Sequence, residues 1–194
     1  MSIKKKIEEL KEELLLEEAS RMFEEIGYEH MKVADLAKTA KVSVGTIYAI
    51  FASKEGLYLA YIEHQISNFF AELQLRISTD TTPKQKIHNY IELKFSYYIQ
   101  KRKAIEQSAT NNPLFFNTLY SEHSNQFQKI YHYLSECFME LSPTLNDESA
   151  ITMAFALNGF SDGYISQWLE TNNNLLDKVD EVTDLFTGMI EGCK

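Results

Sequence analysis

Apolar residues recur at three- and four-residue steps along most of the 194-residue chain, which is the spacing of one face of an α-helix. The first run predicts a helix that ends near Gly27, a residue type common just after a helix. A second run over residues 33–40 predicts a short helix, and Ser43 then caps a third over residues 44–51. Two short helices joined by a tight turn form a helix-turn-helix pattern. The predicted apolar face of the first helix consists of Ile7, Leu10, Leu14, Ala19, Met22, Phe23 and Ile26.

The rest of the chain is predicted to form long helices, at about 54–78, 84–102, 103–110, 113–141, 147–171 and 174–191. The last is apolar on one face, whereas the one before it is apolar on two and therefore needs two neighbours. With 7 Gly and 3 Pro, the chain has little turn chemistry for a many-stranded sheet. We expect an all-α protein, with a three-helix helix-turn-helix domain at residues 1–53 and a larger helical domain at residues 54–194.

Composition bears on the cellular compartment and on the kind of partner. No run reaches the ~18–20 apolar residues of a membrane span, and the N-terminal region lacks the apolar stretch of a secretion signal, so a cytoplasmic protein is expected. The two cysteines are too few for a disulfide framework. The formal net charge of −9 argues against nucleic-acid binding until charge is counted by segment.

The charge is unevenly distributed. Residues 55–194 hold 10 Lys/Arg and 18 Asp/Glu, whereas residues 32–54 hold Lys32, Lys38, Lys41 and Lys54 against Asp35 alone. One small segment is therefore positive in an acidic chain. This is the local pattern that matters for contact with phosphates.

The third helix has two different faces. At 100° per residue, Ile47, Ile50 and Phe51 share a narrow arc that must pack inward. The opposite arc has small residues at its centre and hydroxyl groups on its flanks, so it can approach a groove floor and reach phosphates or base edges. Periodicity alone leaves open the alternative that this arc simply faces solvent. The outward residues are Gly45, Thr46, Tyr48 and Ala49.

The stretch "FEEIGYEHMKVADLAKTAKVSVGTIYAIFASKEGLYLAYIE", residues 23–63, resembles the N-terminal DNA-binding region of the TetR/AcrR family of transcriptional regulators. The resemblance covers roughly the first third of the chain, and the remainder fits in length and helical character. It implies a homodimer that binds a near-palindromic double-stranded DNA operator and releases it when a small molecule enters the C-terminal domain. The matching residues are Phe23, Gly27, Tyr28, Val33, Leu36, Ala37, Ala40, Val42, Ser43, Gly45, Thr46, Tyr48, Phe51, Ser53, Lys54, Glu55 and Leu57.

Carried over position by position, the resemblance implies the DNA-binding set Lys32, Ser43, Val44, Gly45, Thr46, Tyr48, Ala49 and Lys54. Lys54 stands where the family places a phosphate-contacting lysine. Family members often have Thr or Ser where this chain has Met31 and Lys32, so the usual hydroxyl cap is absent and Lys32 is expected at phosphate instead. Lys41 replaces the usual turn glycine, which costs on the order of 1 kcal/mol if the left-handed conformation is kept. Apolar Val44 and Ala49 hint at contacts with thymine methyl groups.

The N-terminal lysines have two interpretations. Lys4, Lys5 and Lys6 could form a basic arm that reaches along DNA, as in some family members. The glutamates at positions 8, 9, 12 and 13 explain the run as well or better, because they form i,i+4 pairs with lysines on a solvated helix.

Two further sites are expected in the C-terminal domain. The resemblance implies that the last two helices pair with their copies in a four-helix bundle, and the alternative is that both fill the core of one subunit. The predicted interface residues are Phe155, Val182, Leu185, Phe186 and Met189. Clustered aromatics suggest a pocket for a small apolar or aromatic effector, although aromatic residues at helical spacing more often belong to the core. The best effector-binding candidates are Tyr98, Phe115, Tyr120, Tyr164 and Trp168.

We therefore expect a ligand-responsive transcriptional regulator, with repression as the expected sign of regulation. No cofactor, metal site or catalytic residue is expected. An enzyme is the rival class, but no histidine has Glu three residues before it, as helical di-iron sites require, and no phosphate loop or nucleophile elbow occurs. A third class is a helical small-molecule-binding protein whose DNA-binding head is vestigial.

Overall fold

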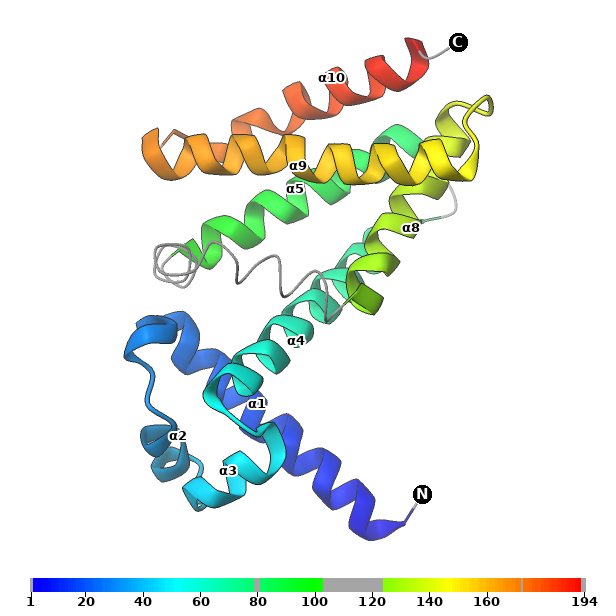
Figure 1. The fold of residues 1–194 in the computed structure, drawn as a ribbon. Helices are drawn as coiled ribbons and strands as arrows, with labels where there is room; N and C mark the ends of the chain where they lie inside the picture. Colours follow the sequence, from blue (N-terminus) through cyan, green and yellow to red (C-terminus); the bar gives the residue numbers. More distant parts are fainter. Residues whose placement is uncertain (1, 79–80, 103–123, 172, 193–194) are drawn as a thin grey trace. The chain divides into compact units, whose positions relative to one another are not determined.

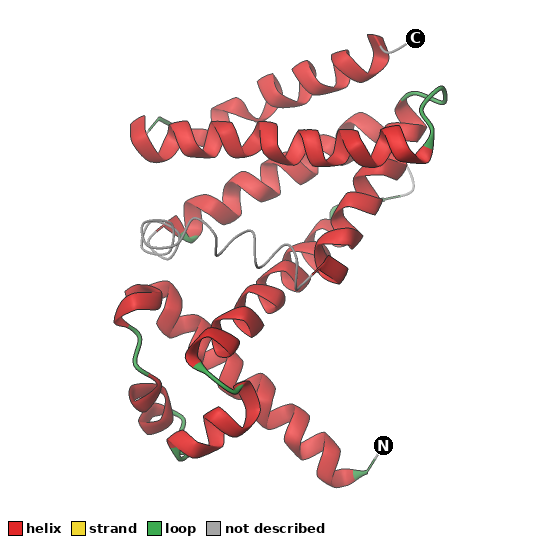
Figure 2. Ribbon diagram, in the orientation of Figure 1, coloured by secondary structure: helices red, strands yellow, loops and turns green. Residues whose placement is uncertain are grey.

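The computed structural model describes residues 2–78, 81–102, 124–171 and 173–192, with the side chains of residues 124–127 left aside. Over these ranges the chain is helical and contains no strand (Figure 1, Figure 2), so the predicted all-α class is confirmed. The elements are α1 (Ile3–His30), α2 (Val33–Thr39), α3 (Val44–Phe51), α4 (Lys54–Leu75), α5 (Pro83–Gln100), α8 (Ser124–Leu141), α9 (Asp147–Thr171), the 3-10 helix η1 (Leu175–Lys178) and α10 (Val179–Gly192).

Most predicted helices lie close to their expected positions. The last predicted helix is divided into η1 and α10, because Asn174 caps a 3-10 turn by accepting a hydrogen bond from the Leu176 amide. The helix predicted at residues 103–110, and the start of the one predicted at 113–141, lie outside the described residues.

The described residues form two compact units, each treated separately. The first unit runs to Gln65 and also includes Lys101 and Arg102, and the second unit holds Ile66–Gln100 and the residues from Ser124 onward. The division falls within α4, later than the predicted domain boundary at residue 53. Leu57, Tyr58 and Tyr61 explain the difference, because these α4 residues are buried in the core of the first unit.

The core of the first unit joins α1 to the three helices that follow it. Phe23 is fully buried, and its ring lies 5.0 Å from that of Tyr58 and 5.3 Å from that of Tyr61, between ring centroids. Gly27 has φ 75° and ψ 167° and interrupts α1, which continues for one more turn to His30. The predicted break at Gly27 is therefore present, but the helical segment ends three residues later than expected.

The predicted apolar face of α1 is wrong at four positions. Ile7, Leu10 and Leu14 are 61%, 55% and 56% exposed, and Ile26 is 38% exposed. The buried part of α1 begins only at Leu15 and continues through Ala19, Met22 and Phe23. The five-residue step from Leu14 to Ala19 starts a different face of the helix, so Ile7, Leu10 and Leu14 do not lie on the face that Ala19, Met22 and Phe23 bury.

The second unit has its core between α5, α8, α9 and α10, with the end of α4 added by Phe69 and Leu73. Inside this core lies a charged group, the ammonium of Lys94 on α5. Its Nζ lies 2.7 Å from Asp162 Oδ1 and donates hydrogen bonds to Asn158 Oδ1 at 2.7 Å and Ser161 Oγ at 2.8 Å. Burial lowers the pKa of Lys94, and Asp162 opposes that shift. The network ties α5 to α9.

Candidate nucleic-acid interface

The turn between α2 and α3 is held by a side-chain cap and a left-handed residue. Ser43 Oγ accepts a hydrogen bond from the Thr46 amide at 3.0 Å, as an N-cap serine does. Val42 N–H donates to the Ala37 carbonyl at 2.9 Å, closing the end of α2. Lys41 has φ 55°, so the left-handed conformation expected from the glycine it replaces is kept. The predicted cap and the predicted local strain are both present.

Helix α3 has the two faces that the sequence predicts. Ile47 and Phe51 are 0% and 6% exposed and belong to the core of the first unit. Val44 and Tyr48 are 37% and 44% exposed. Gly45 and Ala49 are exposed beside them, and Thr46 is half-buried with its hydroxyl 2.9 Å from that of Ser43. The outward face of α3 therefore consists of small or neutral side chains, without a charge between Val44 and Phe51.

A sharp corner fixes α3 against the start of α4. Ala52 between the helices has φ 63° and ψ −46°. A Cβ atom at Gly56 would lie 2.0 Å from the Phe51 carbonyl oxygen, which is far inside contact distance, so the corner requires glycine. The Gly56 amide donates to Ser53 Oγ at 3.0 Å, and this caps α4. Sequence reasoning missed the role of Gly56, because periodicity carries no signal of a close backbone approach.

Lys54, at the first position of α4, is held by groups from α1. Its Nζ donates to the Glu29 carbonyl at 3.4 Å and lies 4.4 Å from the centre of the Tyr28 ring. The Tyr28 hydroxyl donates to Glu55 Oε1 at 3.0 Å. Burial and this hydrogen bond raise the pKa of Tyr28 to about 12. Tyr28 and Glu55 therefore position Lys54, a role that the sequence suggested only through their place in the family motif.

The other cations of the segment are exposed. Lys32, Lys38 and Lys41 have no ion-pair partner within the described part of the chain, and Asp35 is the acidic residue of the segment. Lys32 occupies the N-cap position of α2 without a side-chain cap, as its lack of a hydroxyl predicts. These lysines give the first unit exposed positive charge in the segment that holds the neutral helix face.

The N-terminal lysines lie on the exposed first turns of α1. Lys5 Nζ is 3.8 Å from Glu9 Oε1, an i,i+4 pair with both side chains about half exposed or more. This pair favours the solvated-helix interpretation of the lysine run over a basic arm.

The predicted effector residues are only partly described. Trp168 is buried in the second core, Tyr98 packs against that core, and the Tyr164 hydroxyl donates to Glu181 Oε1 at 2.9 Å. Phe115 and Tyr120 lie outside the described residues. The effector site therefore stays a prediction.

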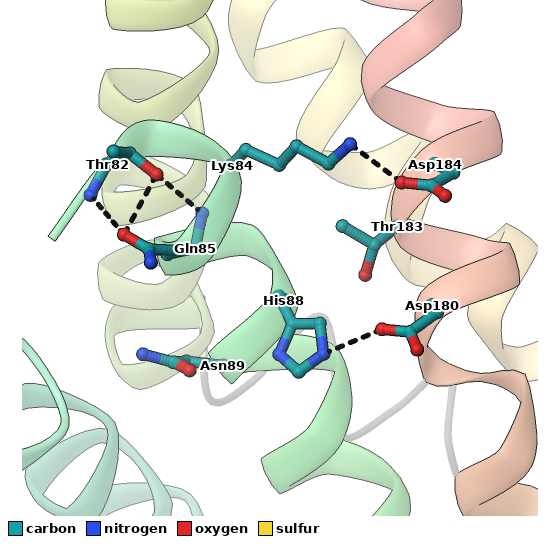
Figure 3. Close-up of a pocket in the computed structure, with 8 residues that line it drawn as sticks. All are labelled: Thr82, Lys84, Gln85, His88, Asn89, Asp180, Thr183 and Asp184. Carbon is teal, nitrogen blue, oxygen red and sulfur yellow. Dashed lines mark hydrogen bonds and ion pairs between the residues drawn. The ribbon is translucent and has the colours of Figure 1, made fainter.

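A pocket of about 430 Å³ lies between the start of α5 and α10, and none of the predicted effector residues lines it (Figure 3). His88 Nε2 is 3.1 Å from Asp180 Oδ1, and Lys84 Nζ is 2.7 Å from Asp184 Oδ1. Thr82 and Gln85 satisfy each other in a capping box. The pairs His88–Asp180 and Lys84–Asp184 thus join α5 to α10 across this pocket, whereas Thr82 and Gln85 cap α5.

The predicted dimer residues divide into two groups. Val182 and Phe186 are 0% and 1% exposed in the core of the second unit, so they have no surface to offer a second subunit, and their assignment to an interface is corrected. Phe155, Leu185 and Met189 are 53%, 50% and 53% exposed. The exposed residues of α9 from Thr152 to Gln167 carry no charge, although 24% of the chain is charged; they are Thr152, Phe155, Ala156, Gly159, Phe160, Gly163, Ser166 and Gln167.

Other chemistries find little support in the described residues. No three His, Cys, Asp or Glu side chains gather there in a way that could hold a metal ion. No helix of that part of the chain has both the length and the apolar character that crossing a membrane requires.

Comparison with known proteins agrees with the helix-turn-helix. The model of the "Bacterial regulatory proteins, tetR family" matches residues 15–61. The nucleoid occlusion factor SlmA of Mannheimia succiniciproducens is 27% identical over 113 residues, 58% of this chain and 52% of SlmA. The chain spans about half the length, or less, of the first curated relatives that it matches.

Solved structures extend the likeness beyond the first unit. The fatty acid degradation regulator FadR from Bacillus halodurans has a TM-score of 0.71 at 20% identity, over 92% of this chain and 95% of its own. FadR from Bacillus subtilis, solved with stearoyl-CoA, has a TM-score of 0.67 at 19% identity, over 89% and 96%. At these identities the likeness establishes the fold. Residues 15–61 therefore match the helix-turn-helix region of the tetR family of bacterial regulatory proteins, and the fold is shared with the two FadR structures along most of the chain.

Proposed function

We propose that the chain is a DNA-binding transcriptional regulator that inserts α3 into the major groove of a near-palindromic operator. The observation that carries this proposal is the outward face of α3, where neutral Val44, Gly45, Tyr48 and Ala49 are exposed in the same segment as the exposed Lys32, Lys38 and Lys41. A helix with small central residues can lie close to base edges, while lysines at its margins neutralise phosphates. Repression is the sign of regulation that we propose.

The groove-facing set is Lys32, Ser43, Val44, Gly45, Thr46, Tyr48, Ala49 and Lys54. Ser43 contributes by capping α3, and it leaves the Thr46 hydroxyl close to the start of the helix. Lys54, steered by the Tyr28 ring, meets a phosphate at the other end of the same surface. Sequence preference then comes from Tyr48 and from apolar contacts of Val44 and Ala49 with thymine methyl groups.

A homodimer is the form that we propose binds the operator, through α9 and α10. The uncharged outward face of α9 and the exposed side chains of Phe155, Leu185 and Met189 support this face. Cβ atoms added at Gly159, Gly163 and Gly188 would meet nothing within 4 Å in the chain itself. Glycine lowers the stability of a helix by about 1 kcal/mol relative to alanine. A close approach by a second subunit would explain why glycine stands at these positions.

The second unit, in this proposal, binds a small apolar or aromatic effector that releases the operator. FadR of Bacillus subtilis has the same fold and was solved with stearoyl-CoA, which supports a ligand with a long apolar part. Tyr98, Tyr164 and Trp168, with Phe115 and Tyr120 beyond the described residues, remain the proposed contacts.

The test is selection of random duplex DNA on the purified protein at physiological salt, followed by sequencing of the retained DNA. Recovery of an inverted repeat supports operator binding, and its half-site spacing gives the geometry of the dimer. If a folded dimer retains no motif, the proposal fails, and the chain is better described as a small-molecule-binding protein with a vestigial head.

A further inference from the structure

The first turns of α1 carry an apolar stripe that nothing in the described chain covers. Ile3, Ile7, Leu10 and Leu14 are 79%, 61%, 55% and 56% exposed. They follow one another at steps of four, three and four residues, which is the spacing of the a and d positions of a coiled coil. Residues 2–14 are all exposed, so the stripe lies on a helical segment with no close neighbour among the described residues of the first unit.

The stripe is not a continuation of the buried face of α1. At 100° per residue its four side chains fall within an arc of about 60°. The buried residues Leu15, Ala19, Met22 and Phe23 centre about 135° away around the same helix. The two apolar faces therefore point in different directions, and a helix or loop that covers the core face leaves the stripe exposed.

Charged residues border the stripe in an order that distinguishes an antiparallel from a parallel pair of these helices. With Ile7 and Leu14 at a and Ile3 and Leu10 at d, Lys6 and Glu13 occupy the g positions on one border. Neither has an ion-pair partner within the part of the chain that the structure describes. In an antiparallel pair of identical helices the g positions face each other, so Lys6 of each copy meets Glu13 of the other.

A parallel pair gives the opposite result. There a g residue meets the e residue of the following heptad, so Lys6 faces Lys11 and Glu13 faces Glu18 of the second copy. The antiparallel pair has one unfavourable border, where Lys4 faces Lys11, but Glu8 lies one turn from both lysines on its own helix and reduces their repulsion.

We propose that this stripe is a self-association surface that binds the same segment of a second copy in antiparallel orientation. Two-fold symmetry repeats each contact, so Ile7 meets Leu10 and Ile3 meets Leu14 twice in one pair. A lipid surface is less suited as occupant, because Lys4, Lys5, Lys6 and Lys11 are balanced by four glutamates at positions 8, 9, 12 and 13. The surface lies on α1 and is separate from the α9 and α10 face, so it joins copies beyond a dimer.

Sedimentation equilibrium of the full chain, without DNA or effector, tests the inference. We expect the chain to associate further at high concentration. Leu10→Lys should remove this association step, whereas Glu12→Lys, on the outer side of the helix, should leave it intact. Leu10 is exposed, so its replacement leaves the fold unchanged by circular dichroism. Equal association of the wild type and Leu10→Lys overturns the inference. The same measurement on Leu185→Lys separates association through the α1 stripe from dimerisation through the proposed α9 and α10 face.

Charge exchange tests the orientation. Lys6→Glu alone and Glu13→Lys alone should each weaken the step about fivefold, because both symmetric pairs become repulsive. The double variant Lys6→Glu/Glu13→Lys should restore it, because the pairs are then formed with exchanged signs. A parallel pair instead predicts that Lys6→Glu strengthens the step by meeting Lys11, and that result overturns the antiparallel arrangement.

Discussion

Gly56 in the first unit and Gly163 in the second unit both lie within helices, but a methyl group added to them meets different surroundings. At Gly56 the new carbon would lie 2.0 Å from the Phe51 carbonyl oxygen, whereas at Gly163 it would meet nothing within 4 Å. The first glycine is required by its own chain. No contact within one subunit requires glycine at position 163, and none explains the uncharged residues exposed beside it on α9.

The difference extends to the two surfaces. The outward face of α3 is shaped by constraints inside the first unit: the Ser43 cap, left-handed Lys41 and the corner at Gly56. The exposed residues of α9 from Thr152 to Gln167 carry no charge and combine Gly159 and Gly163 with Phe155 and Phe160, and no such internal constraint accounts for them. The proposed partners differ accordingly: a DNA groove for the outward face of α3, and a second subunit for the outward face of α9.

The largest effect is expected at Gly56. Gly56→Ala forces the Phe51 carbonyl and the α3–α4 corner to move, so we expect a loss on the order of 3 kcal/mol in the free energy of unfolding. Operator affinity should fall with it, since the corner orients α3. Chemical denaturation measures the loss, and Gly45→Ala is the matched control, because a Cβ there lies an ordinary 3.7 Å from Ser43 Oγ. Equal stability of the two variants would contradict the required close approach.

Next in size is the charged core of the second unit. Asp162→Ala removes the carboxylate 2.7 Å from Lys94 Nζ and leaves a buried ammonium without its counter-charge. Because the side chain of Asp162 is itself 42% exposed, we expect a loss of about 2 kcal/mol, below the range for a fully buried pair. Glu72→Ala, which breaks the partly exposed pair with Arg76, should cost less than about 1 kcal/mol by the same denaturation measurement.

The sign of the pH dependence follows from Lys94. Its pKa is lowered by burial, so the unfolded chain binds more protons than the folded chain, and stability rises with pH. Without Asp162 the pKa of Lys94 falls further, so from neutral pH upward the deficit of Asp162→Ala should shrink as pH rises. A deficit that grows over this range would show that the pair does not act through the Lys94 charge.

The proposed α9 and α10 face is tested at Leu185. Leu185→Lys places a charge on an exposed apolar residue of α10, so the dimer dissociation constant should rise at least about tenfold while the fold is retained. Light scattering measures the mass. Leu176→Lys is the control, because Leu176 on η1 is also exposed, at 41%, but lies outside the proposed face. A Leu185→Lys variant that stays dimeric would remove this face from the proposal.

The two kinds of contact proposed for the first unit should respond differently. Tyr48→Ala should cost about 1–3 kcal/mol in operator binding and relax sequence preference if Tyr48 reaches base edges as proposed. Lys54→Ala should weaken all sequences alike and lower the salt dependence by about one phosphate contact per subunit. Binding titrations at several salt concentrations separate the two, and Lys4→Ala serves as a control for general charge. Unchanged affinity in both variants would reject the placement of α3.

Sequence reasoning succeeded where the determinants are local. The Ser43 cap, the left-handed Lys41 and the inward Ile47 and Phe51 all follow from residues within one or two turns of each other. It failed at Leu10, which it grouped with buried residues of α1 on one apolar face, and at Phe186, which it placed at an interface. The period of a helix groups residues on a face, but the element that covers the face is fixed by the distant chain.

The Lys94 network also could not be predicted from the sequence, because its partners lie far away along the chain. Its hydrogen bonds join residues 64 to 68 positions apart, from α5 to α9. A lysine within an apolar run reads as a surface residue until the partner helix is placed against it. The carboxylate that compensates the buried charge, Asp162, carries no mark in the sequence that assigns it to Lys94.

The smallest effect is expected at Gly163, with opposite signs in two measurements. Gly163→Ala adds a methyl group to open space on a helix, so the free energy of unfolding of the single subunit should rise by about 0.8–1 kcal/mol. The same methyl group should weaken dimerisation, because it fills the space that a second α9 would occupy. The unfolding of Gly163→Ala is measured in the Leu185→Lys background, in which the proposed dimer is weakened. Association is measured with Gly163→Ala as the single substitution. Greater stability without weaker association would mean that no helix approaches Gly163, and the contrast with Gly56 would then concern the fold alone.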